Sequence, residues 1–148
     1  MVDAQNRLQR LEDLEAIRNL IASYGPLADS GDADGVAALW SVNGTYDVGG
    51  FGVSVGRPAI AALISGDTHQ SLMAQGCAHI LSPHQIMLNG ATAIATGYSI
   101  VFRKIGDAYE AWRVSYNRWE LSRQTDGSWL VDMRVNRPVR GAPLKHLG

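Results

Sequence analysis

The sequence predicts a single α+β domain over residues 1–148, in which helices cover one face of a curved antiparallel sheet. Three observations favour this class. Apolar residues recur at spacings of three and four in the first part of the chain, which is the period of a helix. From about Gly76 onward the pattern becomes strand-like. Three tight-turn signals, Asn89-Gly90, Gly106-Asp107 and Asp126-Gly127, divide this part into four strands.

The first half of the chain is predicted to be mostly helical. An amphipathic helix should span residues 6–24, with charged residues between its apolar positions. Gly25-Pro26 should break or kink this helix, because proline lacks a backbone donor and crowds the preceding turn. A short helix should follow over residues 33–40, with Asp32 as its N-cap.

The remaining segments are shorter. Two strands are expected within residues 44–55, around a turn at Gly49-Gly50. Arg57-Pro58 should begin a further helix that ends near Ser65, because proline is favoured in the first helical turn. The tail, residues 137–148, is expected to be extended or loosely docked.

The three turns allow the pairing of the strands to be predicted. If each loop has two residues, Asn117 lies opposite Thr96 in one hairpin and opposite Asn136 in the next. The same register pairs His79 with Ile100, and Arg134 with Trp119. Because side chains alternate along a strand, one sheet face should then carry five polar or aromatic residues: His79, Asn117, Trp119, Arg134 and Asn136.

A histidine, an arginine and two asparagines on one face are unusual for a plain core. In a flat sheet, His79 and Arg134 would nevertheless be about six rows, or roughly 20 Å, apart. They could meet only through a longer loop, a bulge or strong coiling of the sheet. Pro83, inside the first predicted strand, is a natural position for a bulge.

Composition excludes several classes of partner. A net charge of −1 and a pI near 6.4 give no reason to expect binding to nucleic acid or to an anionic membrane. No apolar run approaches the ~20 residues of a membrane span, and the charged N-terminus lacks a signal-peptide core, so a cytoplasmic location is expected. The single cysteine, Cys77, excludes an internal disulfide and is expected to be a small buried hydrophobe.

Known cofactor and metal motifs do not fit. A calcium loop starting at Ser30 would need glutamate at its twelfth position, which is Ser41. The segment GGFGVSVG lacks the spacing of a dinucleotide-binding loop. His79 and His84 are five residues apart and should point to opposite faces unless Pro83 bulges the chain. No metal and no cofactor are therefore expected, and no G-x-S-x-G motif supports serine hydrolysis.

Three aspartates lie close together before the second predicted helix. Asp32 caps that helix, and Asp34 in its first turn complements the helix dipole. Asp29 has neither structural role, so it is a candidate for chemistry together with His79. Structural alternatives stay open, with Asp29 in a surface turn and His79 as a hydrogen-bonded core histidine. Arg134 could pair with a surface acid at a sheet edge.

Several segments resemble the SnoaL-like group of the nuclear-transport-factor-like superfamily, from LEDLEAIRNLIASY through DSGDADGVAALW and GTYDVGG to CAHILSPHQIMLNG and DGSWLVDMRVNR. They look most like the branch that holds scytalone dehydratase, bile-acid dehydratase and hexachlorocyclohexane dehydrochlorinase. Members are cone-shaped α+β domains in which a curved antiparallel sheet and N-terminal helices enclose an apolar pocket. The resemblance implies that fold here, and a homodimer formed through the convex sheet face.

The resemblance also implies an Asp-His dyad, with Asp29 and His79 in the two positions of the family's motif. Tyr24 matches a tyrosine or lysine five residues before the aspartate, and Arg134 matches an arginine of the C-terminal strand. Tyr46 matches a pocket tyrosine. Further candidates for substrate binding are Asn117, Trp119 and Tyr98. His84 stands where many relatives carry asparagine, so its role stays open.

The leading hypothesis is a cofactor-free lyase or isomerase acting on a small hydrophobic, cyclic substrate. His79 would be the general base, Asp29 would orient it, and Tyr24 and Arg134 would stabilise a leaving hydroxyl or an oxyanion. One alternative is a ligand-binding or dimerisation module without catalysis. Another is a polyketide cyclase or a ketosteroid-type isomerase, in which a carboxylate takes the proton.

Overall fold

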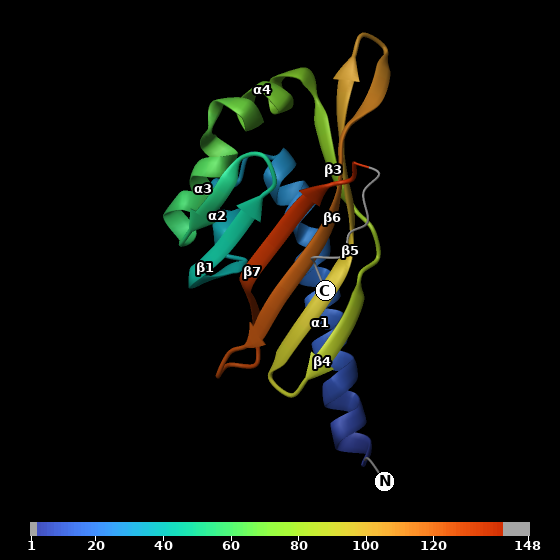
Figure 1. Cartoon of the computed structure of the whole chain (residues 1–148). Coiled ribbons are helices and arrows are strands. Elements are labelled where there is room, and N and C mark those ends of the chain that lie inside the picture. The colour runs from blue at the N-terminus through green and yellow to red at the C-terminus, as the bar shows by residue number, and fades with distance from the viewer. Residues whose placement is uncertain (1–2, 141–148) are drawn as a thin grey trace.

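The computed structural model describes residues 3–140 of the 148-residue chain (Figure 1). It is an α+β domain, as predicted, in which four helices cover one face of a curved seven-stranded sheet. The helices are α1 (Ala4–Asp29), α2 (Ala33–Ala37), α3 (Arg57–Ser65) and α4 (Asp67–Gln75). The strands are β1 (Trp40–Val48), β2 (Gly52–Val55), β3 (Cys77–Leu81), β4 (Gln85–Asn89), β5 (Thr92–Ile105), β6 (Ala108–Arg123) and β7 (Trp129–Pro138).

The sheet has the strand order β2-β1-β7-β6-β5-β3, and β4 also pairs with β5. All pairs are antiparallel except β1 with β7, which is parallel. Aromatic and aliphatic side chains of the helices and of the inner sheet face form the core, including Ile17, Ile21, Trp40, Trp119 and Val131. In the part of the chain that the structure describes, no helix is both long and apolar enough to cross a membrane.

Helix α1 continues through Gly25-Pro26, so the predicted end at residue 24 is wrong, while the alternative of a kink stays a prediction. Gly25 is buried where α1 crosses β3, and a Cβ atom at this position would clash with the carbonyl oxygen of His79. The glycine therefore allows close approach of helix and strand, and does not end the helix. The helix ends at Asp29, where Ser30 donates its backbone N–H to the Pro26 carbonyl at 3.0 Å.

Helix α2 is shorter than predicted, because Trp40 is the first residue of β1. Its N-cap is Asp32, as predicted, since Asp32 Oδ1 accepts a hydrogen bond from the backbone N–H of Gly35 at 2.8 Å. The turn at Gly49-Gly50 and helix α3 are also confirmed. Helix α4 was not predicted, because its sequence is mostly polar and buries only His69 and Leu72.

The second half has five strands, because the first predicted strand is interrupted between Leu81 and Gln85, around Pro83. Both pieces pair with β5, but His79 lies opposite Val101 rather than Ile100. Between Val101 and Phe102 the β5–β6 register shifts by one residue, because Trp112 is an extra residue in β6. Asn117 consequently lies opposite Gly97 rather than Thr96. The predicted pairs Asn117 with Asn136 and Trp119 with Arg134 are confirmed.

Candidate active site

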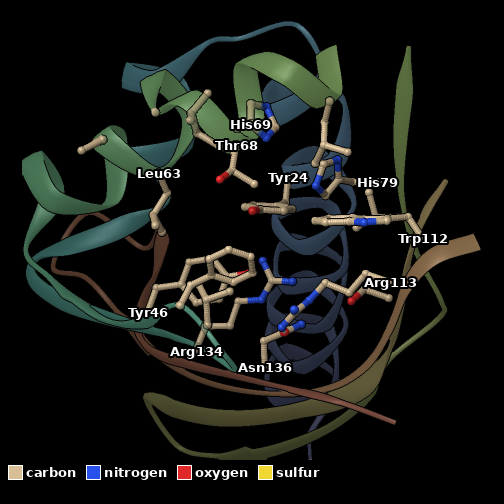
Figure 2. Close-up of a pocket in the computed structure, with 18 of the residues that line it drawn as sticks. Tyr24, Tyr46, Leu63, Thr68, His69, His79, Trp112, Arg113, Arg134 and Asn136 are labelled. Atoms are coloured by element: carbon tan, nitrogen blue, oxygen red, sulfur yellow. The ribbon is translucent and has the colours of Figure 1, made fainter. Parts of the chain in front are cut away.

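A cavity of about 230 Å³ lies between the inner face of the sheet and the helices (Figure 2). Most of its wall is aromatic or aliphatic and comes from both layers: Tyr24, Tyr46, Val48, Phe51, Leu63, Ile64, Leu72, Leu81, Val101 and Trp112. Its polar side chains include Thr68, His69, His79, Ser99, Arg113, Arg134 and Asn136. Pockets for drug-sized ligands usually measure roughly 300–1,000 Å³, so this cavity suits a smaller molecule.

His79 and Arg134 line this one cavity despite their separation in the sheet. Strong curvature of the sheet brings them together, and the ring of Tyr24 lies between them (Figure 2). The Tyr24 centroid is 6.1 Å from that of His79 and 4.3 Å from Arg134 Cζ. Tyr46 also lines the cavity, and its burial raises the pKa of its hydroxyl well above the ordinary value.

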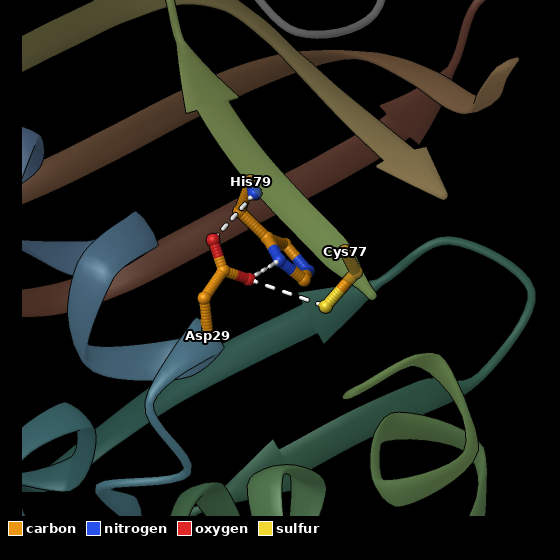
Figure 3. Close-up of side chains that lie close together, drawn as sticks. All are labelled: Asp29, Cys77 and His79. Carbon is orange, nitrogen blue, oxygen red and sulfur yellow. Dashed lines mark hydrogen bonds and ion pairs between the residues drawn. The ribbon is translucent and has the colours of Figure 1, made fainter. Parts of the chain in front are cut away.

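Asp29 lies beside His79, at the end of α1 (Figure 3). Its Oδ1 is 2.6 Å from His79 Nδ1, and its Oδ2 accepts the backbone N–H of His79 at 2.8 Å. Burial tends to raise the pKa of Asp29, but the hydrogen bonds from His79 outweigh it and hold that pKa below the ordinary value. An ionised Asp29 keeps the proton of the imidazole on Nδ1 and leaves Nε2 free to accept one.

Cys77 is the third member of this group, and its thiol donates to Asp29 Oδ1 at 3.4 Å. It is only partly buried, so it is not the plain buried hydrophobe that was expected. Burial and the neighbouring Asp29 carboxylate raise the pKa of the thiol to about 11, so it is protonated at neutral pH. Asp29, Cys77 and His79 offer ligand atoms within 4.8 Å, of types that bind zinc. The same atoms of Asp29, Cys77 and His79 Nδ1 are already joined by direct hydrogen bonds.

On the opposite side of the cavity, the guanidinium of Arg134 is stacked against three aromatic rings. Its Cζ is 4.3 Å from the ring centroid of Tyr24, 4.5 Å from that of Tyr46 and 4.1 Å from that of Trp119. Its Nε and Nη2 both donate to Asn117 Oδ1, at 3.1 and 2.9 Å. Arg134 Nη1 is buried and has no hydrogen-bond partner among residues 3–140.

Arg113 lies beside Arg134 on the same wall (Figure 2). Its Nη2 donates to the Gly49 carbonyl at 2.6 Å and to Asn136 Oδ1 at 2.7 Å. The amide of Asn136 in turn donates to Asn117 Oδ1 at 3.0 Å. Two asparagine amides therefore connect the two arginines in one hydrogen-bonded network.

Four predicted site residues do not line the cavity, and one of them is Asp29, which acts on it only through His79. Asn117 and Trp119 are fully buried beneath Arg134, which they hold in place. Tyr98 is 49% exposed on the other face of the sheet, where it packs against Tyr116. Tyr98 lies between Gly97 and Ser99, and strand alternation turns these two neighbours toward the helices instead.

His84 has a structural role that the sequence left open. Its Nδ1 donates to the Ser82 carbonyl at 2.6 Å, and its Nε2 accepts from Trp119 Nε1 at 3.2 Å. Both ring nitrogens are therefore used with the ring neutral. Burial lowers the pKa of His84, and the positive charge of Arg134 lowers it further.

Sequence reasoning missed several residues of the cavity wall. Trp112 and Arg113 are neighbours on β6 and would normally face opposite sides. Arg113 faces the cavity by strand alternation, and the bulge brings Trp112 to the same side. No sequence pattern indicated this bulge. His69 was missed together with α4; its Nε2 donates to the Ala28 carbonyl at 2.6 Å, and its ring centroid is 5.5 Å from that of His79.

The family model of the SnoaL-like domain matches residues 9–135. The chain belongs to the SnoaL-like family. No curated protein matches it significantly. A nuclear-transport-factor-like protein with a cystatin-like fold from Novosphingobium aromaticivorans is 49% identical, with a TM-score of 0.91 over 96% of this chain and 94% of that one.

Two more distant solved structures share the fold of this SnoaL-like domain. One is a protein of unknown function from Mycobacterium tuberculosis, at 22% identity and a TM-score of 0.79, over 93% of this chain and 77% of that one. The other is a protein from Catenulispora acidiphila in complex with S-DNPA. It is 18% identical, with a TM-score of 0.72 over 84% of this chain and 91% of that one.

Proposed function

We propose that this SnoaL-like protein is a cofactor-free lyase or isomerase that removes a carbon-bound proton from a small, hydrophobic, cyclic substrate. The observation that carries the proposal is the 2.6 Å hydrogen bond between Asp29 and His79 Nδ1, in the wall of a largely apolar cavity. This arrangement leaves Nε2 of a neutral His79 as the proton acceptor. A positioned general base of this kind contributes typically ~10²–10⁴-fold to a rate.

Each neighbour has a role in this reaction. Asp29 holds the imidazole in one tautomer and stabilises the imidazolium that forms after proton transfer. In an elimination, the electrons of the broken C–H bond form a C=C bond, and the leaving group departs from the adjacent carbon. In an isomerisation, they form an enolate, and the imidazolium of His79 returns the proton to another carbon of it. Tyr24 donates to the oxygen that gains charge, and the positive field of Arg134 stabilises it.

A carboxylate base is less well supported, because both oxygens of Asp29 are engaged by His79. Asp67 also lines the cavity, but it is exposed at the start of α4. Tyr46 belongs to the wall that would contact the substrate, while Asn117 and Trp119 act through Arg134. The ligand in the Catenulispora acidiphila structure supports a small-molecule site in this fold.

A homodimer through the outer face of the sheet stays a prediction. Ile80 and Tyr98 lie on this face and are 51% and 49% exposed, which supports a covered surface there. Sedimentation of the purified protein at several concentrations would test it. A monomer at all concentrations would contradict the prediction without affecting the proposed chemistry.

The proposed chemistry can be tested without knowing the substrate, because a general base catalyses exchange of acidic C–H protons for deuterium. Cyclohexanone and 1-tetralone in D₂O are suitable probes, followed by NMR. Wild-type protein should catalyse exchange next to the carbonyl, and His79→Ala should slow it by ~10²–10⁴-fold. Added imidazole should restore part of the rate, which it could not do if His79 were only structural.

Tyr98→Phe on the outer sheet face is the matched control and should exchange at the wild-type rate. Exchange that persists unchanged in His79→Ala would contradict the proposal. Tight binding of a ring ketone with no exchange above buffer would identify a ligand-binding module instead.

A further inference from the structure

The cavity carries two positive charges that no acidic side chain of the protein offsets. Among residues 3–140, the ion pairs of arginine involve Arg103, Arg118, Arg123 and Arg137, whereas Arg113 and Arg134 form none. The terminal residues 1–2 and 141–148 contain no aspartate or glutamate. Asp67 lines the cavity but forms no ion pair with either arginine.

In the described part of the chain, the hydrogen-bond acceptors of these two arginines are neutral. Arg134 donates there only to the amide oxygen of Asn117. Arg113 donates to the amide oxygen of Asn136 and to the Gly49 carbonyl. Removing a cation from water without a counter-ion is costly, and stacking on aromatic rings offsets only part of that cost. The arrangement is therefore expected where a ligand brings the missing negative charge.

Several contacts hold the side chain of Arg113 in place at the cavity, unlike that of a flexible surface arginine. Arg113 lies opposite Val101 and two residues before the buried Ser115, so strand alternation turns it toward the cavity, where its side chain is partly buried. The Gly49 carbonyl and Asn136 fix its Nη2, and Cζ is 5.5 Å from the ring centroid of Phe51. Its Nε and Nη1 make no hydrogen bond with residues 3–140, so N–H donors remain for a ligand.

We propose that the substrate is a small cyclic carboxylic acid whose carboxylate binds Arg113, next to the field of Arg134. This inference rests on the proposed function in taking the cavity as the substrate site. The two oxygens of a carboxylate match the planar fork of a guanidinium. The apolar wall receives the ring of the substrate. The carboxylate is thus anchored on the arginine side, and a ring C–H can face His79.

The test compares a carboxylate with its neutral isostere, using cyclohexanecarboxylate and cyclohexanecarboxamide as probes in titration calorimetry at neutral pH. Wild-type protein should bind the carboxylate at least tenfold more tightly, as expected for charge-assisted hydrogen bonds in a partly buried site. Arg113→Met keeps the stem that packs on Phe51 but removes the charge, and it should abolish this preference. Arg113→Lys keeps the charge but loses the fork, and it should retain an intermediate preference.

Arg118→Met is the matched control, because Arg118 lies on the same strand, on the other face, and pairs with Glu120. It should keep the full preference of the wild type. Circular dichroism and thermal unfolding show whether each variant is folded. Inorganic phosphate, which carries charge but no ring, should bind at least tenfold more weakly than cyclohexanecarboxylate.

Three results would overturn the inference: a wild type that does not prefer the carboxylate, a preference that survives in a folded Arg113→Met, or phosphate binding as tight as the carboxylate. Because binding is measured without turnover, this test is separate from the exchange assay. An Arg113-dependent preference without His79-dependent exchange would contradict the proposed function alone. The reverse pair of results would contradict the carboxylate alone.

Discussion

The charged groups on the two sides of the cavity differ in their hydrogen-bond partners. On the His79 side, the carboxylate of Asp29 receives hydrogen bonds from the ring and the backbone of His79 and from the thiol of Cys77. On the arginine side, Arg113 and Arg134 donate, within residues 3–140, only to neutral oxygens. The Asp29 carboxylate is thus fully hydrogen-bonded by its neighbours in the chain, whereas Arg113 and Arg134 have no acidic partner among residues 3–140.

Under the two proposals above, this difference separates proton abstraction from anion binding within one site. A base needs a fixed tautomer and a counter-charge present before the substrate arrives, and both are built into the end of α1 and β3. A binding group for an anion must keep its charge available, and the sheet keeps it so by offering amides instead of acids. Substitutions of Asp29 and His79 should therefore change the rate, and substitution of Arg113 should change affinity.

The largest effect is expected from Asp29→Asn. The amide would donate to His79 Nδ1, which places the remaining proton on Nε2 and removes the proton acceptor from the cavity. Deuterium exchange should slow by roughly 10²–10⁴-fold, while the dissociation constant of cyclohexanecarboxylate should change less than threefold. Asp32→Asn is the matched control, because asparagine caps a helix as well as aspartate does. An equal loss of affinity and rate in Asp29→Asn would mean that the two sides are not separate.

Gly25→Ala should have an intermediate effect, because it forces α1 away from β3 at His79. The added Cβ would clash with the His79 carbonyl oxygen, and overpacking of this kind costs about 1–3 kcal/mol in the free energy of unfolding. Exchange should also slow, since Asp29 moves with the helix, whereas the arginine side is unaffected. Urea unfolding and the exchange assay measure both quantities. Ser23→Ala in the same helix should change neither, and wild-type behaviour of Gly25→Ala would contradict the role of the close approach.

Much of the fold could be predicted because hydrophobic period and turn residues are local signals. They indicated α1, α3 and the strand-rich second half. They failed at Gly25-Pro26, where local propensity predicted a break but tertiary packing against β3 selected a continuous helix. They also failed for α4, since a helix that buries two side chains leaves little apolar pattern to detect.

The shared face of His79 and Arg134 was predicted partly by cancellation of errors. The assumed register was one residue off between β3 and β5, and one residue off again between β5 and β6. Because the two shifts oppose each other, His79 lies in the same row as Arg113 in both the predicted and the observed register. Bulges depend on tertiary packing, so a register taken across several hairpins carries this uncertainty in any sequence.

The two sides of the cavity also differ in which of their residues were singled out from the sequence. Asp29 and His79 were singled out from the sequence by elimination and by family resemblance, and the structure places them in contact. Arg113 has the strand parity of Asn117 and Trp119, but no motif or family match singled it out, and Trp112 reaches the cavity only through the bulge in β6. Tyr98 was placed on the wrong face because no strand parity was worked out for it.

The smallest expected effect is the pH dependence of stability that Asp29 contributes. Its pKa in the folded protein is below the ordinary value of 3.8, so the unfolded chain takes up the proton first as the pH falls. The stabilisation is therefore complete above pH ~5 and is lost as the pH drops through the folded-state pKa. Because the carboxyl is only half-buried, solvent screening keeps the contribution small. The difference in free energy of unfolding between wild type and Asp29→Asn should shrink from pH 5 to pH 3, measured by urea titration. A constant difference would show that Asp29 is not held ionised by His79, and the contrast between the two sides of the cavity would lose its basis.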